Sequence, residues 1–285
     1  MNLTDINVIR PLLAENGFRF SKAKGQNFLR DASVPPRIAD AAGLDAETGV
    51  LEVGPGVGCL TVELAARAKR VVSVEVDTAL KPVLAVTLAG LENVEVLLAD
   101  VLALDIPRLV REEFADCARV CVCANLPYSI TSPALVKLLE ADTFDSICIM
   151  LQREVCRRIC ARENTADYGA FSVFVQWHAE PEMLFDVPRG CFVPEPKVDS
   201  AVIMLTRRAE PLCAVGSEEK MFKVVRAAFA QRRKTLVNAL ANGLGITREQ
   251  AADAIAECGL PPAVRGEALG IEQFAELSDK LRGTI

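Results

Sequence analysis

The sequence predicts an α/β fold, with a mostly parallel sheet that has an antiparallel edge, followed by a small α-helical domain. Short apolar runs alternate with helical patterns between residues 50 and 162. A glycine-rich turn follows the first of these runs, and only helical patterns occur after residue 207. Such alternation is typical of a parallel sheet that helices cover on both faces.

The first 42 residues precede this alternation. Apolar residues at Ile6, Ile9 and Leu12 predict a helix within residues 1–20, ended by Gly17. Residues 21–30 are expected to form a loop that folds over a bound ligand as a lid. Residues 31–42 are expected to form a short helix with prolines in its first turn.

The alternating region predicts strands at 50–53, 71–75, 94–98, 119–124 and 146–151, and helices at 59–68, 78–88, 133–139 and 152–162. Two further strands, 182–187 and 201–206, have only a loop between them, which favours an antiparallel pair at one edge. Helices are then expected at 218–230, 235–241, 248–258 and 271–281. The predicted domains are therefore residues 1–207 and residues 208–285.

Composition narrows the class of protein. The chain has 285 residues, of which 51% are hydrophobic and 25% are charged, as in globular proteins. No apolar stretch reaches membrane-spanning length, and the first residues lack the features of a signal peptide, so we expect a cytoplasmic protein without membrane contact. The ten cysteines form no C-x-x-C pair and are expected to be small buried apolar residues. With one histidine, no metal site is expected.

The charge balance does not by itself indicate a nucleic-acid partner, because the net charge is −6. Basic residues nevertheless cluster at Arg153–Arg162 and at Arg226–Lys234. Contact with phosphates depends on such local clusters. For the first cluster a solvated helix face is an equally good interpretation, whereas for the second we favour a functional one.

The glycine-rich turn is Glu52-Val-Gly54-Pro-Gly56-Val-Gly58, between a strand and a helix. Glycines there allow positive φ angles and a close approach of the backbone to a ligand. Glu75 lies 21 residues beyond Gly54, where an acid that binds ribose is expected, so a dinucleotide site also fits. The G-x-G-x-G spacing argues against that alternative, and Glu52 is placed to hold an amino-acid portion of the ligand, directly or through water.

One further position supports a nucleotide-like ligand. Asp100 follows the third strand, where its carboxylate can accept hydrogen bonds from an adenine amine. Alone it would be interpreted as an ordinary turn aspartate, but together with Gly54 and Glu75 the functional interpretation is better.

The most informative segment is Asn125-Leu126-Pro127-Tyr128, which follows an apolar strand. An asparagine oxygen and a backbone carbonyl can together accept both hydrogens of an exocyclic amine. Pro127 fixes the turn, and the ring of Tyr128 offers a face on which a base can stack. Phe192, in a loop stiffened by Pro194 and Pro196, could form a second stacking face, although a packed aromatic residue in a rigid turn is also common.

Five motifs in this order resemble the bacterial KsgA/RsmA family of ribosomal RNA adenine N6,N6-dimethyltransferases. They are Gly25–Leu29, Glu52–Gly56, Asn125–Tyr128, Phe192–Ala201 and Gln231–Leu236. The resemblance spans roughly residues 15–285. The related Erm methyltransferases of large-subunit rRNA share the sheet motifs, whereas the Gln231–Leu236 stretch and the helical tail are more similar to KsgA.

The resemblance implies a Rossmann-like class I methyltransferase fold with a seven-stranded sheet, and S-adenosylmethionine as methyl donor. By position it implies that Asn27 and Leu29 contact the cofactor from the lid, Gly54 lines its pocket, Glu75 holds the ribose, Asp100 faces the adenine amine, and Asn125 lies near cofactor and target. This sequence departs from the family's pattern at two places, Cys59 and the Ala-Asp-Val sequence at 99–101, and both changes are small.

The implied reaction is direct methyl transfer to N6 of two adjacent adenosines in the 3′-terminal hairpin of 16S rRNA. The target adenosine is expected to flip out of its stack. Asn125, with the Leu126 or Pro127 carbonyl, then binds the amine, and Tyr128 and Phe192 clamp the base. The implied partner is small-subunit rRNA within the immature 30S subunit, bound by a monomer through residues 208–285.

Three alternatives stay open at this level. An NAD-linked oxidoreductase gives no account of the Asn125–Tyr128 segment. An Erm-type enzyme shares the chemistry but modifies large-subunit rRNA. A ribosome-assembly factor would use the helical tail for binding, with catalysis secondary.

Overall fold

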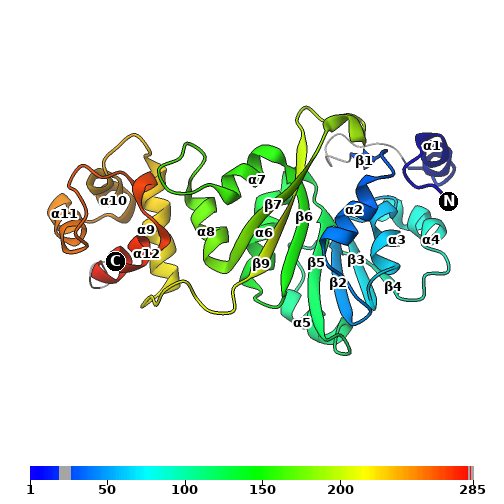
Figure 1. Cartoon of the computed structure of the whole chain (residues 1–285), viewed down its shortest axis with the longest axis horizontal. Helices are drawn as coiled ribbons and strands as arrows, with labels where there is room; N and C mark the ends of the chain where they lie inside the picture. Colours follow the sequence, from blue (N-terminus) through cyan, green and yellow to red (C-terminus); the bar gives the residue numbers. More distant parts are fainter. Residues whose placement is uncertain (19–26, 282, 284–285) are drawn as a thin grey trace. The chain divides into compact units, whose positions relative to one another are not determined.

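The computed structural model describes residues 1–18, 27–281 and 283 (Figure 1). The strands are β1 (Phe28–Leu29), β2 (Thr48–Val53), β3 (Arg70–Glu75), β4 (Val94–Leu98), β5 (Arg119–Asn125), β6 (Ser146–Gln152), β7 (Ala179–Val187), β8 (Phe192–Val193) and β9 (Ser200–Arg207). The α-helices are α1 (Ile6–Glu15), α2 (Val34–Ala41), α3 (Cys59–Ala65), α4 (Lys81–Thr87), α5 (Ile106–Glu113), α6 (Thr131–Glu140), α7 (Arg153–Cys160), α8 (Ala170–His178), α9 (Glu218–Ala230), α10 (Leu236–Leu244), α11 (Arg248–Glu257) and α12 (Ile271–Lys280). Short 3₁₀ turns include η2 (Thr78–Leu80), η3 (Tyr128–Ile130), η4 (Arg189–Cys191) and η5 (Gly266–Ala268).

The large sheet has seven strands in the order β4-β3-β2-β5-β6-β9-β7. Neighbouring strands from β4 to β6 are parallel, and β9 is antiparallel to β6. The predicted mostly parallel seven-stranded sheet with an antiparallel edge is therefore confirmed. Its order changes direction between β2 and β5, and in such sheets ligands bind at the carboxyl ends of the strands beside that point.

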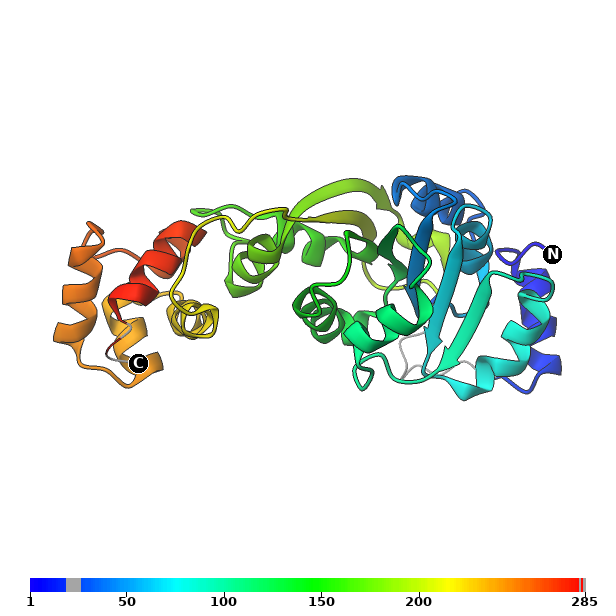
Figure 2. The same cartoon turned by 90° about the horizontal axis from the view of Figure 1, so that it is seen from below.

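Helices cover both faces of this sheet (Figures 1 and 2). On one face, Ile38 of α2 and Leu64 of α3 belong to the same apolar cluster as Val50, Val71 and Cys123 of the strands. The alternate residues of the strands, which point to the other face, are also fully buried, with no exposure at Leu51, Val72, Val122 and Ile149. Burial on both faces explains why the strands are near-continuous apolar runs.

Contacts divide the chain into two compact units, which we describe separately. The first contains Met1–Cys156 and Pro181–Arg207, and the second contains Arg157–Glu180 and Arg208–Ile285. The chain passes between the two units after Cys156, after Glu180 and after Arg207, so residues 157–180 group with the second unit. The reason is that Val173 and Trp177 of α8 pack into the apolar cluster that α9 to α12 form.

Four elements of the structure were not predicted from the sequence. They are the helices α5 and α8 and the two-residue strands β1 and β8. The last two pair with each other as a separate antiparallel sheet, with Leu29 opposite Phe192. All ten cysteines are free thiols, and in the part of the chain that the structure describes no helix is long and apolar enough to cross a membrane.

Candidate active site

One pocket lies where the parallel strands β2 to β5 end. Every site residue that the sequence singled out lines it: Asn27, Leu29, Gly54, Glu75, Asp100, Asn125, Leu126, Pro127, Tyr128 and Phe192. These residues come from six separate segments of the chain. The fold therefore brings together every candidate position. Of the expected lid, residues 21–26 lie outside the described residues, so the lid can be followed only from Asn27 onward.

The glycine turn after β2 forms one wall of the pocket. Gly54 and Gly56 have φ angles of 74° and 60°, in the left-handed region that favours glycine. The Gly54 N–H donates to the Val74 carbonyl at 2.9 Å, which joins the turn to the neighbouring strand. A Cβ added to Gly56 would lie 3.3 Å from Cε1 of Phe28, so a side chain there would press against a residue that lines the pocket. The turn thus leaves the backbone open to a ligand.

Glu75 ends β3 and is only 5% exposed. Its Oε1 accepts the Asp77 N–H at 2.8 Å, and its Oε2 accepts the Gly56 N–H at 3.4 Å. Burial raises the pKa of this carboxyl, and the two backbone donors oppose that shift. Two N–H groups therefore fix the carboxylate, and its remaining lone pairs are available to a ligand in the pocket.

Glu52 lies deeper, at 1% exposure. Its Oε2 accepts hydrogen bonds from the hydroxyls of Thr61, at 2.7 Å, and Ser73, at 2.6 Å. Burial raises the pKa of Glu52 to about 7, and the charge of Glu75 adds to that rise. Because one oxygen is held by two hydroxyls, Glu52 is fixed at the floor of the pocket, and its protonation state changes near neutral pH.

Asp100 is exposed in the turn that follows β4. Its Oδ1 accepts the Leu102 N–H at 2.9 Å. The Leu102 carbonyl in turn accepts a hydrogen bond from Nζ of Lys137 on α6 at 2.9 Å. The turn interpretation and the functional one are compatible, since one carboxylate oxygen caps the turn while the side chain as a whole lines the pocket.

The corner after β5 has defined backbone partners. The Leu126 N–H donates to the Met150 carbonyl of β6 at 3.3 Å. The Pro127 carbonyl accepts the Ile130 N–H at 3.1 Å and the Thr131 hydroxyl at 3.4 Å. Since a carbonyl has two lone pairs, the Pro127 carbonyl is already satisfied. Of the two carbonyls that the sequence left open as acceptors for an amine, Leu126 is the better candidate.

The two aromatic candidates differ in exposure. Tyr128 is partly exposed, and its hydroxyl lies 2.7 Å from that of Ser200. Phe192 lines the pocket but is only 2% exposed, because β8 pairs with β1 and places Phe192 opposite Leu29. The ring of Tyr128 is therefore the more accessible stacking surface, and that of Phe192 is mainly part of the pocket wall.

Other lining residues were missed by sequence reasoning. They include Phe28, Val76, Leu102 and Ile130. Val76 could have been found from the sequence, because it is an apolar residue directly after Glu75, the acid that ends the strand. In the structure its side chain is 62% exposed. The thiol of Cys59 also lines the pocket, but burial raises its pKa to about 12, so it is a protonated thiol and not a nucleophile at neutral pH.

Comparison with known proteins adds to this geometry. Residues 17–281 match a family model described as ribosomal RNA adenine dimethylase. Proteins named ribosomal RNA small subunit methyltransferase A, from Geobacillus thermodenitrificans and Bacillus licheniformis, are both 46% identical to this chain. The first similarity covers 95% of the chain and 94% of the relative, and the second covers 97% and 96%.

Solved structures also resemble the chain. The 23S rRNA methyltransferase ErmE is 32% identical, with a TM-score of 0.66, over 90% of this chain and 99% of that one. A dimethyladenosine transferase from Plasmodium falciparum has a TM-score of 0.74 over 90% of this chain and 97% of that one. At 22% identity, the latter similarity supports the fold alone.

Proposed function

The chain belongs to the ribosomal RNA adenine dimethylase family, and we propose that it uses S-adenosylmethionine to dimethylate N6 of two adjacent adenosines near the 3′ end of small-subunit rRNA. The observation that carries the proposal is the shared pocket. It combines the glycine turn and two strand-end carboxylates with the Asn125–Tyr128 corner, so a nucleoside cofactor and an exocyclic amine can be held side by side.

The pocket residues fit the cofactor. S-adenosylmethionine, when bound, supplies a methyl group that its sulfonium makes electrophilic. The turn at Gly54 and Gly56 lacks the side chains that would narrow the pocket against Pro127 and Phe28. Glu75 provides acceptors for the two ribose hydroxyls, and Asp100 provides one for the adenine amine. A floor carboxylate at Glu52 suits a charged amino group, and such a partner favours the ionised form of that acid.

The residues of the corner bind the target amine. Asn125 Oδ1 and the Leu126 carbonyl accept the two N6 hydrogens and turn the amine lone pair toward the methyl donor. The ring of Tyr128 stacks on the base, which is worth about 1–3 kcal/mol per base in comparable complexes. Phe192 contributes a largely buried part of the pocket wall. Catalysis is then mainly positioning, which can supply up to about 7–11 kcal/mol.

No residue of the pocket is required as a strong base. Once methylated, the amine carries a positive charge and releases its proton readily. Burial raises the pKa of the Tyr128 phenol as well as that of the Cys59 thiol, so both are protonated at neutral pH. The Asn125 amide does not titrate at all. We therefore expect a shallow dependence of methyl transfer on pH between about 7 and 9.

The second unit supplies a basic surface for rRNA. Arg232, Arg233 and Lys234 are exposed in the turn before α10, and Arg232 also pairs with Glu267 at 3.3 Å. Such a turn can contact phosphates even though the whole chain is acidic. Affinity for small subunits should therefore fall as salt rises, and neutralising this turn should reduce the slope of that dependence.

A radiolabelled transfer assay tests the proposal. Tritiated S-adenosylmethionine is offered to small ribosomal subunits that lack their 3′-end adenine methylation, and separately to protein-free large-subunit rRNA. The proposal requires label in N6,N6-dimethyladenosine of the small subunits alone. The similarity to ErmE makes large-subunit rRNA the relevant second candidate, and label there would replace the proposed substrate.

A further inference from the structure

The hydroxyl of Tyr128 is bound by a residue outside the pocket lining. Its Oη lies 2.7 Å from Oγ of Ser200, and Ser200 has no exposed surface. The side chain of Ser200 therefore cannot meet a ligand directly. The hydrogen bond to Tyr128 joins its hydroxyl to a residue of the pocket lining.

Ser200 is a fixed point in the fold. It is the first residue of β9 and pairs with Gln152, the last residue of β6. The preceding residue, Asp199, accepts the Arg153 N–H with its carbonyl and the Arg189 N–H with its Oδ1, both at 3.0 Å. Hydrogen bonds from Arg153 and Arg189 therefore fix the start of β9. A group that is hydrogen-bonded to Ser200 is held in place by the same contacts.

A tyrosine at the wall of a pocket has two side-chain torsions that it can change. Its backbone is anchored after β5, and the hydrogen bond to Ser200 anchors the far end of the ring. Ser200 also ends the segment that begins at Phe192, the second aromatic residue of the pocket. One hydrogen bond therefore connects the Asn125–Tyr128 corner with the segment that begins at Phe192, another residue of the pocket lining.

From this geometry we infer that Ser200 is a positioning residue, whose hydroxyl holds the ring of Tyr128 at the angle that stacks the target base for methyl transfer. The inference rests on the proposed function. It has a specific consequence for the second methylation. After the first transfer N6 keeps one hydrogen, so Asn125 and the Leu126 carbonyl lose one of their two bonds to it. The second transfer then depends more on stacking against Tyr128.

The kinetic test compares Ser200→Ala with Tyr128→Phe, which removes the same hydrogen bond from the other side and keeps both the ring and Ser200. Each is expected to lower kcat about 5- to 10-fold, with KM changed less than twofold and with a higher ratio of N6-methyladenosine to N6,N6-dimethyladenosine. The double variant should be no slower than either single one. Tyr168→Phe is the matched control, since it removes a hydroxyl bonded at 3.0 Å to the Leu269 carbonyl within the second unit. Its kcat and product ratio should equal those of the wild type.

Two kinetic outcomes would overturn the inference. One is a kcat for Ser200→Ala within twofold of the wild type, with an unchanged product ratio. The other is a double variant whose loss equals the product of the two single losses, because the residues would then act independently.

A spectroscopic test needs no substrate and so separates this inference from the proposed function. The chain has only two tyrosines, so protein labelled with ¹³C at tyrosine Cζ gives two signals, which Tyr128→Phe assigns. Ser200→Ala should move the Tyr128 signal and raise its alkaline titration midpoint, since the Ser200 hydroxyl lowers the pKa that burial raises. The Tyr168 signal should stay in place. An unmoved Tyr128 signal would show that the bond is not formed in solution, whereas a wild-type chain inactive on both RNAs would refute the proposed function instead.

Discussion

The parallel strands of the large sheet carry charged side chains at both ends, and these charges have different partners. At the carboxyl ends, Glu52, Glu75 and Asp100 accept hydrogen bonds from hydroxyls and backbone N–H groups. Within the described residues none of the three forms a salt bridge. At the amino ends, the charged residues pair with one another.

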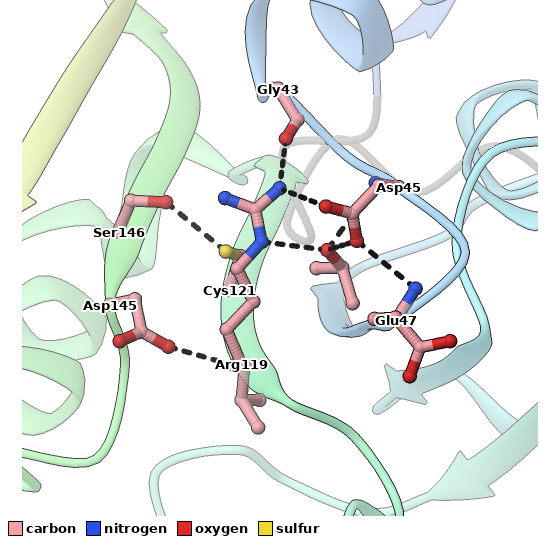
Figure 3. A network of polar contacts seen from close by, with 9 residues as sticks. Gly43, Asp45, Glu47, Arg119, Cys121, Asp145 and Ser146 are labelled. Carbon is pink, nitrogen blue, oxygen red and sulfur yellow. Dashed lines mark hydrogen bonds and ion pairs between the residues drawn. The ribbon is translucent and has the colours of Figure 1, made fainter.

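Arg119, at the start of β5, shows the amino-end arrangement (Figure 3). Its guanidinium donates to the Thr48 hydroxyl at 2.9 Å and to the Gly43 carbonyl, and it contacts Asp45 at 3.3 Å. Asp45 itself accepts hydrogen bonds from the Thr48 hydroxyl and the Glu47 N–H. Those hydrogen bonds and the charge of Arg119 lower the pKa of Asp45.

Arg70, at the start of β3, repeats the pattern. It pairs with Glu95 at 2.5 Å and with Glu113. At the amino ends the charges are therefore paired within the protein, although Nε of Arg70 is buried without a hydrogen-bond partner among the described residues, whereas the carboxylates at the other end lack cationic partners and retain capacity to accept. Burial raises the pKa of Glu52 and of Glu75, so the ionised forms of these two carboxylates cost stability, and we expect a ligand with hydroxyl or amino donors to offset that cost.

The largest effect is expected when the amide of Asn125, at the carboxyl end of β5, is removed. Asn125→Ala should lower kcat for methyl transfer about 100- to 1000-fold, as expected when one preorganised polar group is lost from a reacting centre. Binding to small subunits and the thermal midpoint should change little. The matched control is Asn93→Ala, whose amide donates to the Ala65 and Ala68 carbonyls. That variant should lose stability but retain kcat, and a similar kcat loss in both variants would contradict the account.

The second prediction concerns the stability that the protein loses when buried Glu52 is ionised. The pKa of Glu52 is raised from 4.5 to about 7, so its contribution to stability is fully present below about pH 4.5 and is lost as the pH rises through about 7. The loss amounts to about 3 kcal/mol. Glu52→Gln keeps an oxygen for the two hydroxyls and has no charge to bury. In urea unfolding at pH 5.5 to 8.5, the free energy of unfolding of the variant relative to that of the wild type should increase as the pH rises. A difference between the two free energies that does not depend on pH would contradict this.

A third test measures cofactor binding at the carboxyl ends of the strands. Glu75→Gln should weaken the binding of S-adenosylhomocysteine about 10-fold in isothermal titration calorimetry, since one charged acceptor for the ribose is lost. Glu95→Gln changes a carboxylate of the amino-end network in the same way, and there the Kd should not move. Equal Kd values for Glu75→Gln and the wild type would remove Glu75 from the proposed site.

The smallest effect is expected at the amino end. Arg119→Ala should lower the thermal midpoint by about 2–4 °C, because partly exposed ion pairs contribute little. Its kcat and cofactor Kd should match those of the wild type. A fall in kcat beyond fivefold at unchanged stability would show that the two ends are functionally coupled.

Much of the sheet was predictable because its strands are buried on both faces and appear as apolar runs. Helix α5 was missed although Asp105 is a clear N-cap that accepts the Arg108 N–H, because only Ile106 and Leu109 of the helix are buried. Helix α8 was missed for the opposite reason. Six of its nine residues are apolar and they are not confined to one face, and its packing with α9 to α12 is a tertiary feature that no local pattern reveals.

The site was predictable where the residues end strands. Parallel strands bring their carboxyl ends together, so Glu75, Asp100 and Asn125 could be placed at one edge from the order of motifs. The satisfied state of the Pro127 carbonyl and the bond between Tyr128 and Ser200 could not be foreseen. They depend on the register of β9 with β6 and on the turn η3, which are set by packing.

A crystal structure of the chain with S-adenosylhomocysteine tests most directly whether the carboxyl ends of the strands bind the cofactor. We expect the ligand in the pocket at the carboxyl ends of β2 to β5, with its ribose hydroxyls on Glu75 and its adenine amine on Asp100. The Arg119 network at the amino ends should be unchanged. A ligand bound elsewhere, or bound in this pocket without contact to either carboxylate, would contradict the account.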